Sequence, residues 1–297
     1  MIELKNIKNN SVVVVAGPTA SGKSALAIDL ALRYNGEIVN ADSMQVYAGT
    51  PIISAAPTDE EKKLVPHHLY EIYHPSQKGT VVDWLRLAVK TIKEIWARNK
   101  VPFVVGGTGM YIDNLINGTT PIPEPSSAVR RQVKNMTDVY AWLAENDKDA
   151  AEMLNSADTS RVRRAAEVFL QTGKSIADWY KEPMVKYLPE AEFRVIKIIP
   201  TAEELDERCY VRFDKMIKAG AIEEANHLNS LNLSCDLPAM KMLGVPELIG
   251  FVRGESDLEE AIALAKLHTR QYAKRQRTWF RNKLEAEIIL DKCFVVG

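Results

Sequence analysis

One segment near the start of the chain matches the phosphate-binding pattern G-x-x-x-x-G-K-[ST] at every fixed position. It reads Gly17-Pro18-Thr19-Ala20-Ser21-Gly22-Lys23-Ser24. The β-branched run Val12–Val15 before it predicts a buried parallel strand, and the Ala- and Leu-rich run after it, residues 25–34, predicts a helix. Strand, loop and helix stand in the order that the motif requires, which favours a phosphate site over an ordinary glycine-containing turn.

The residue types of this loop suit a phosphate ligand. Glycines let successive backbone N–H groups converge on phosphate oxygens at the N-terminus of the helix, and Lys23 adds a positive charge. The hydroxyl of Ser24 can hold Mg²⁺, which is the cofactor that we expect. The loop therefore predicts binding of a diphosphate or a triphosphate.

Strand-like apolar runs recur along the 297 residues, with helical stretches between them. They are Val12–Ala16, Glu37–Asn40, Val101–Val105 and Val195–Ile199, with a weaker candidate at Ile288–Leu290. This alternation predicts an α/β fold, a parallel sheet flanked by helices. A proline-rich stretch from Thr119 to Pro125 opens a segment with helical patterns and no convincing strand. We expect a core domain of residues 1–117 and 190–297, with a small all-helical domain inserted at 118–189.

Composition excludes several other classes of protein. Cys209, Cys235 and Cys293 are far apart and show no C-x-x-C spacing, which disfavours a disulfide framework or a zinc site. Nothing in the sequence approaches the roughly 18 apolar residues of a membrane span. We expect a cytoplasmic protein without a membrane partner.

Two segments place polar groups where a parallel sheet has its active site, at the carboxyl ends of strands. Asp42 follows the second strand and can accept a proton or a hydrogen bond or help to hold Mg²⁺; a helix N-cap is an equal alternative. Gly106-Gly107-Thr108-Gly109 follows the third strand. Its glycines would let a ligand approach the backbone, or else form a tight turn into the next helix.

Arginines gather at the start of a helix in the inserted segment. Arg161, Arg163 and Arg164 gain nothing there from the helix dipole, which suits a polyanionic partner. The alternative is a solvated face with pairing to Asp158 and Glu167.

Two further basic groups lie after the insert. Arg270, Lys274, Arg277 and Arg281 are four, three and four residues apart, so on a helix they would form one stripe that could follow a phosphate backbone or simply face solvent. Tyr272, Trp279 and Phe280 nearby are expected to pack inward. Arg208 and Arg212 share a helix face and could clamp a diphosphate; salt bridges to Glu204 or Asp206 are the alternative.

The motifs, taken in order, resemble those of the bacterial tRNA dimethylallyltransferases over nearly the whole chain. The matching segments are Gly17–Ser24, Asp42-Ser43, Pro66-His67-His68-Leu69, Gly106–Tyr111, Arg161–Val168, Gly173-Lys174, Arg208–Met216 and Arg270–Trp279. The resemblance implies a P-loop NTPase-like core. It also implies transfer of a dimethylallyl group from dimethylallyl diphosphate to the N6 amine of the adenosine 3′ of the anticodon, with release of diphosphate.

The resemblance also assigns roles to residues. It implies Asp42, Thr19 and Arg212 as catalytic residues and Ser24 as the metal-binding residue. The diphosphate would be held by Gly17, Pro18, Thr19, Ala20, Ser21, Gly22, Lys23, Ser24, Arg208 and Arg212. The tRNA contacts would be Asp42, Ser43, Met44, Gln45, Thr108, Arg130, Ser160, Arg161, Val162, Arg163 and Arg164, with Arg270, Lys274, Arg277 and Arg281 gripping the stem phosphates. The partners implied are the anticodon stem-loop of tRNA and dimethylallyl diphosphate, and we expect a monomer.

The chain departs from the family pattern at two places. Where relatives commonly read Gly-Thr-Ala-Lys-Pro, this chain has Ile53-Ser54-Ala55-Ala56-Pro57, without the lysine. A usual Gly-Tyr is replaced in Gly244-Val245-Pro246-Glu247. Two other functions share the core features: a P-loop small-molecule kinase, and an adenylate isopentenyltransferase that acts on free nucleotides.

Overall fold

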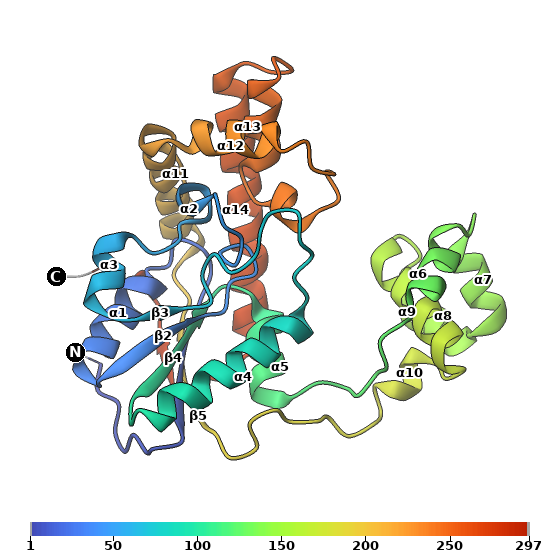
Figure 1. The fold of residues 1–297 in the computed structure, drawn as a ribbon, viewed down its shortest axis with the longest axis horizontal. Coiled ribbons are helices and arrows are strands. Elements are labelled where there is room, and N and C mark those ends of the chain that lie inside the picture. The colour runs from blue at the N-terminus through green and yellow to red at the C-terminus, as the bar shows by residue number, and fades with distance from the viewer. Residues whose placement is uncertain (1, 296–297) are drawn as a thin grey trace. The chain divides into compact units, whose positions relative to one another are not determined.

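The computed structural model describes residues 2–295, which form two compact units (Figure 1). The chain up to Ile116 and again from Tyr187 onward makes one unit, which we call the core unit. The other unit, Asn117–Lys186, we call the insert. The insert bounds that we predict from the sequence, 118–189, lie within a few residues of this division.

The core unit contains one sheet of six parallel strands in the order β3-β2-β4-β1-β5-β6. The strands are β1 (Ser11–Ala16), β2 (Gly36–Asn40), β3 (His67–His68), β4 (Val101–Gly106), β5 (Glu192–Ile198) and β6 (Ile288–Leu290). All five predicted runs form strands, which confirms the parallel sheet. Only the two-residue edge strand β3 is missing from the prediction.

Strand β1 shows why the sheet needs helices on both faces. All of its residues are buried. Val12 and Val14 join one apolar cluster while Val13 and Val15 join another, because successive side chains of a strand point to opposite faces. The run of valines therefore fits a strand at the centre of the sheet.

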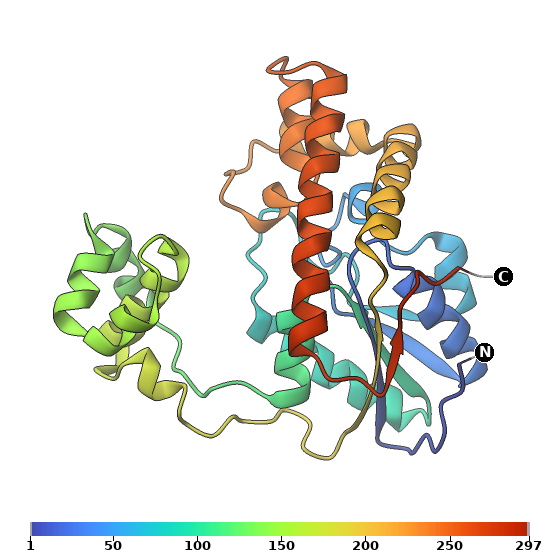
Figure 2. The ribbon, with the colours of Figure 1, turned by 180° about the vertical axis from the view of Figure 1, so that it is seen from behind.

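Helices of the core unit cover these two clusters. They are α1 (Lys23–Arg33), α2 (Pro51–Ser54), α3 (Asp59–Leu64), α4 (Val81–Ala97), α5 (Gly109–Asn117), α11 (Ala202–Ala219), α12 (Ala221–Ser230), α13 (Val245–Val252) and α14 (Leu258–Lys283), with a 3₁₀ turn at Pro238–Lys241. Helix α1 packs in the cluster of Val13 and Val15, whereas α4, α5 and α11 to α14 contribute to the cluster of Val12 and Val14. Figure 2 shows α14 as one long helix. It begins where Asp257 accepts a hydrogen bond from the Glu260 N–H.

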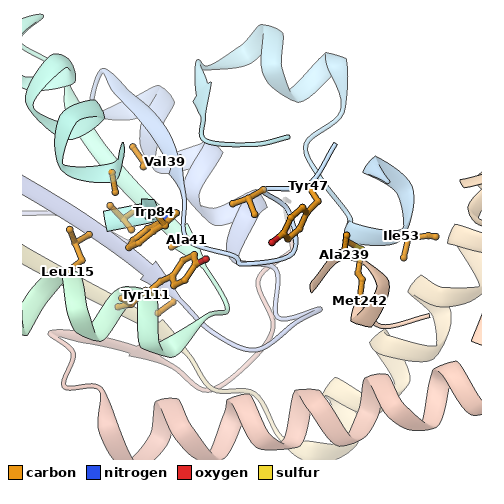
Figure 3. Close-up of a cluster of buried hydrophobic side chains, with 14 of the residues drawn as sticks. Val39, Ala41, Tyr47, Ile53, Trp84, Tyr111, Leu115, Ala239 and Met242 are labelled. Carbon is orange, nitrogen blue, oxygen red and sulfur yellow. The ribbon is translucent and has the colours of Figure 1, made fainter. Parts of the chain in front are cut away.

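The larger cluster also fixes the end of β2. Trp84 of α4 stacks on Tyr111 of α5 with ring centroids 4.4 Å apart (Figure 3). The indole Nε1–H of Trp84 donates to the carbonyl of Asn40, at 2.8 Å. A fully buried ring therefore anchors the last residue of β2, two positions before Asp42.

The insert has helices and an apolar core of its own. The helices are α6 (Ser127–Lys134), α7 (Val139–Asn146), α8 (Lys148–Met153), α9 (Thr159–Thr172) and α10 (Ile176–Trp179). They pack around buried Val133, Leu143, Ala165 and Val168, and a bridge pair of Thr119 with Val185 joins the ends of the segment. Across both units, the described helices include none with the length and apolar character needed to cross a bilayer.

Candidate active site

The phosphate loop lies between β1 and α1, as the motif requires. Its backbone enters the left-handed region twice, at Ala20 (φ 63°) and at Gly22 (φ 87°). Gly22 can have no side chain for a second reason, since a Cβ there would lie 2.2 Å from the carbonyl oxygen of Phe294. The glycines of the loop thus serve both its turn and its close contact with the C-terminal segment.

Two arginines of α11 form hydrogen bonds with the phosphate loop. Arg208 Nε–H donates to the carbonyl of Ala20 at 3.0 Å, and the Arg212 guanidinium donates to the hydroxyl of Thr19. The alternative pairing is not what the structure shows: Glu204 accepts from the N–H of Cys293. The two guanidinium groups therefore face the loop together, and their role toward a diphosphate stays a prediction.

The loop has the features of an anion cradle. Burial lowers the pKa of Lys23 from 10.5 to about 8, with Asp42 opposing the shift and Arg212 adding to it. Burial also lowers the pKa of the Arg212 guanidinium. The hydroxyl of Ser21 is buried and has no hydrogen-bond partner among residues 2–295. Two poorly hydrated cations and an unsatisfied polar atom all favour an anionic ligand at this point.

Asp42 lies just after β2, where the sequence places it. Its N–H donates to Asn40 Oδ1 at 2.8 Å, and its Oδ1 accepts from the N–H of Met44 at 3.0 Å. This local turn replaces the helix N-cap alternative, because the next helix, α2, begins only at Pro51. The carboxylate is held in place by its own neighbours.

The glycine-rich turn after β4 packs closely against its neighbours. A Cβ at Gly106 would lie 2.0 Å from the Ala41 carbonyl oxygen, and one at Gly109 would lie 2.4 Å from the ring of Trp279. Thr108 Oγ1 accepts from the N–H of Ser43 at 2.9 Å. The turn therefore joins the ends of β2 and β4, as the tight-turn alternative expects, and ligand approach to its glycines stays a prediction.

Two cavities of the core unit adjoin the phosphate loop. One, of about 290 Å³, is lined by all three predicted catalytic residues, Thr19, Asp42 and Arg212. The other, of about 1190 Å³, is lined by Lys23, Ser24 and again Arg212. The smaller cavity also has lining residues that the sequence did not assign to the site, among them Cys209, Phe213, Lys241, Tyr272 and Arg275. Arg212 thus borders both spaces.

The predicted tRNA contacts in the insert lie on α6 and α9. Arg161 and Arg163 are exposed at the start of α9, and Arg161 pairs with Asp158 at 3.2 Å, as the alternative reading expected. Arg130 is exposed on α6 and pairs with Glu124. The side chain of Val162 is only 3% exposed and belongs to the insert core, so within the predicted tRNA-contacting stretch Ser160–Arg164 only its backbone is left for a contact.

The four residues of the predicted basic stripe lie on α14, and two of them have partners within the core unit. Arg277 Nε–H donates to the carbonyl of Pro200 at 2.6 Å, and Arg270 pairs with Asp206 at 2.8 Å. Arg270, Lys274 and Arg281 are exposed, and Arg277 is half-buried. Two of the four stripe residues thus also bind groups of the protein, and the contact of the stripe with tRNA stays a prediction.

The two departures from the family pattern have local explanations in the fold. Gln45 Nε2 donates to the carbonyls of Ser54 and Ala55, at 3.0 and 2.6 Å, so the segment that lacks the lysine is held by a side chain predicted to contact tRNA. Pro246 lies in the first turn of α13, where proline is tolerated.

Comparison with known proteins decides the family. The sequence model of the IPP transferase family matches residues 45–283. The chain belongs to this family. A tRNA dimethylallyltransferase of Zymomonas mobilis is 41% identical over 280 residues, which covers 94% of this chain and 90% of the relative. One of Rickettsia massiliae is 40% identical over 290 residues, covering 96% and 80%.

Solved structures agree with this assignment. A full-length tRNA isopentenylpyrophosphate transferase of Bacillus halodurans superposes with a TM-score of 0.69 at 34% identity, covering 95% of this chain and 90% of that one. A eukaryotic dimethylallyltransferase acting on tRNA gives a TM-score of 0.83 at 30% identity, covering 95% and 74%. The core unit is therefore a P-loop NTPase-like sheet as found in IPP transferases.

Proposed function

We propose that this chain is a tRNA dimethylallyltransferase that transfers a dimethylallyl group from dimethylallyl diphosphate to the N6 amine of the adenosine 3′ of the anticodon. The observation that carries the proposal is the cavity that Thr19, Asp42 and Arg212 line together, beside the phosphate loop. Family membership supports the same reaction. A monomer in the cytoplasm stays a prediction.

The donor would lie with its diphosphate on the loop. Backbone N–H groups, Lys23 and the two arginines of α11 would neutralise its charge, which makes diphosphate a good leaving group. Arg212 lines both cavities, and in this proposal it would bind the diphosphate oxygen whose bond to the allylic carbon breaks as that carbon bonds to the amine. A cation lowers the barrier only if it binds the transition state more tightly than the ground state. Arg212 would do so by contacting the oxygen on which negative charge develops as the C–O bond breaks.

Mg²⁺ fits the loop as a partner of Ser24 and of the diphosphate. The described residues contain no cluster of three His, Cys, Asp or Glu side chains that could hold a metal alone. Mg²⁺ commonly keeps several waters and binds through substrate phosphates, so one protein hydroxyl is a sufficient donor. When bound, it would supply further neutralisation of the leaving diphosphate.

The acceptor would enter the smaller cavity with its amine near Asp42. The lone pair of an adenine amine is delocalised into the ring, so the amine is a poor nucleophile. Asp42 would accept a hydrogen bond from the amine and take its proton as the C–N bond forms. An adenosine in a stacked anticodon loop must leave the stack to reach such a pocket, and exposed arginines of the insert are suited to hold the RNA.

The test combines protein, Mg²⁺, dimethylallyl diphosphate and an anticodon stem-loop, with mass spectrometry of the RNA. We expect one dimethylallyl group on adenosine. Asp42→Asn keeps an acceptor for the Met44 N–H but removes the base, so it and Asp42→Ala should abolish transfer while stem-loop affinity stays within a few-fold. Robust transfer by either variant removes Asp42 from the chemistry.

The same mixture tests the two rival functions. Release or transfer of the γ-phosphate of ATP without a prenyl donor would favour the small-molecule kinase. Faster prenylation of free AMP than of the stem-loop would favour the adenylate isopentenyltransferase. Exposed arginines at Arg161 and Arg163 speak against both, because a small acceptor does not need them.

A further inference from the structure

Gln276 is a buried polar residue on the apolar face of α14. Gln276 is 6% exposed, and Thr269, Ala273 and Phe280 on the same face are buried too. A buried amide requires hydrogen-bond partners, because leaving it unpaired would cost about 1–3 kcal/mol. Besides Tyr272 on the same helix, its partners lie in two loops of the candidate active site.

Both ends of the amide are used. Gln276 Oε1 accepts from the backbone N–H of Thr19 at 2.8 Å, and Gln276 Nε2 donates to the carbonyl of Gly107 at 2.7 Å. Thr19 belongs to the phosphate loop and Gly107 to the turn after β4. One side chain thus links the two loops to each other and to α14.

The link determines how Thr19 is presented. With its N–H held by Gln276, Thr19 is also held at its hydroxyl, which accepts from Arg212. The backbone and the side chain of Thr19 are therefore fixed from two different helices. The orientation of Arg212 beside the loop depends on Thr19 as well, because the Arg212 guanidinium donates to the Thr19 hydroxyl.

The link also explains why residue 107 is a glycine, and it lies close to Asp42. A Cβ at Gly107 would lie 2.5 Å from Gln276 Nε2, so any larger residue would displace the amide. The same Cβ position lies 3.5 Å from Asp42 Oδ2. The contact between Gln276 and Gly107 is thus made next to the carboxylate.

We propose that Gln276 is a positioning residue, which holds the phosphate loop and the turn after β4 together so that Thr19, Arg212 and Asp42 keep the geometry for prenyl transfer. It touches neither substrate in this role and acts through the backbone of Thr19 and Gly107. The inference rests on the proposed function for its activity readout. A pyrophosphate-binding readout is independent of that function.

The experiment compares Gln276→Met, which keeps the volume and removes both hydrogen bonds, with Gln271→Met, an exposed glutamine on the same helix. For Gln276→Met we expect kcat to fall by about 10- to 100-fold, since small misplacements of reacting groups cost up to about 10²-fold. Pyrophosphate affinity, measured by calorimetry, should fall at least threefold. Stem-loop affinity should stay within twofold, and Gln271→Met should match the parent in every measurement.

Gln276→Glu tests the hydrogen bonds to Thr19 and Gly107 through the protonation state of the new side chain. A protonated glutamic acid can accept from Thr19 and donate to Gly107, whereas the carboxylate would face the Gly107 carbonyl with an unprotonated oxygen. The ratio of its kcat to that of the parent should therefore rise as the pH falls from 8 to 5.5. A ratio that does not change with pH would contradict the hydrogen bond to the Gly107 carbonyl, and the Tm of the variant at each pH shows whether the fold is lost instead.

The outcomes distinguish this inference from the proposed function. If Gln276→Met keeps kcat and pyrophosphate affinity within twofold of the parent, the inference is overturned. A loss that affects stem-loop affinity equally and accompanies a large drop in Tm overturns it as well. If the parent binds pyrophosphate but does not prenylate RNA, the proposed function fails, and weaker pyrophosphate binding by Gln276→Met still supports the positioning role.

Discussion

Titration of Lys23 should make binding of the proposed donor depend on pH. Burial is the main cause that lowers its pKa from 10.5 to about 8, and the nearby Arg212 lowers it further while Asp42 opposes the shift. The ammonium is the charged form that attracts a diphosphate. Raising the pH through 8 removes its proton, so we expect kcat/KM for dimethylallyl diphosphate to fall as the pH rises.

The size of the effect follows from the pKa. A difference between 10.5 and about 8 corresponds to about 3 kcal/mol of cost for the charged form without a ligand. With a pKa of about 8, roughly nine Lys23 side chains in ten are charged at pH 7 and about one in ten at pH 9. The structure thus predicts a fall in kcat/KM of about tenfold between these two pH values.

Stability should change in the opposite direction. Because the folded pKa of Lys23 lies below the unfolded value, the unfolded chain binds more protons between about pH 8 and 10.5. The contribution of Lys23 to the free energy of unfolding therefore rises with pH in that window. At high pH, a lower kcat/KM for the donor without a lower free energy of unfolding would distinguish titration of Lys23 from unfolding.

The assay measures kcat/KM for the donor from pH 6.5 to 9.5 at saturating stem-loop, with constant Mg²⁺ and ionic strength. Lys23→Arg is the matched variant, since guanidinium stays charged throughout this range. Its activity should be lower because the planar group fits the loop differently, but its profile should lack the fall near pH 8. A flat profile for the parent, or the same fall in Lys23→Arg, would refute the reasoning.

Two further predictions concern the fold and the insert. Trp84→Phe leaves the Asn40 carbonyl without its indole donor, so the free energy of unfolding should drop by about 1–3 kcal/mol, and a Tm within 1 °C of the parent by calorimetry would contradict this. Replacing Arg161, Arg163 and Arg164 together by Gln should weaken stem-loop binding at least tenfold and make it less salt-dependent, while donor affinity stays constant; unchanged binding in a filter assay would remove these arginines from the RNA interface.

Local patterns in the sequence were sufficient to predict the sheet and the phosphate loop. Val12–Val15 is apolar on both faces, which is typical of a strand that is covered by helices on both sides of the sheet. The loop motif follows this run directly. Strand β3 could not be found this way. Two histidines, His67 and His68, carry no alternation of apolar residues, and their strand exists only because they pair with Ile38 and Val39.

The α14 stripe shows what helical spacing alone leaves open. Spacing tells which residues share a face, but it does not tell which residues of that face bind groups of the protein. Arg277 is half-buried, and the Pro200 carbonyl accepts its hydrogen bond across 77 residues of sequence. Gln276 shares a helix face with Thr269 and Ala273. A polar residue on that face was the signal in the sequence that could have indicated a buried hydrogen-bonding side chain.

The phosphate loop shows why local motifs stop short of the active site. Its sequence predicts an anion, yet the groups that position Thr19 come from 193 and 257 residues away, in α11 and α14. The fold brings Arg212 to the boundary of the two cavities, where in the proposed reaction one cation would lie close to both the leaving diphosphate and the attacking amine. Since only charge that is better stabilised in the transition state speeds the reaction, this placement would be useful for group transfer and unnecessary for binding alone.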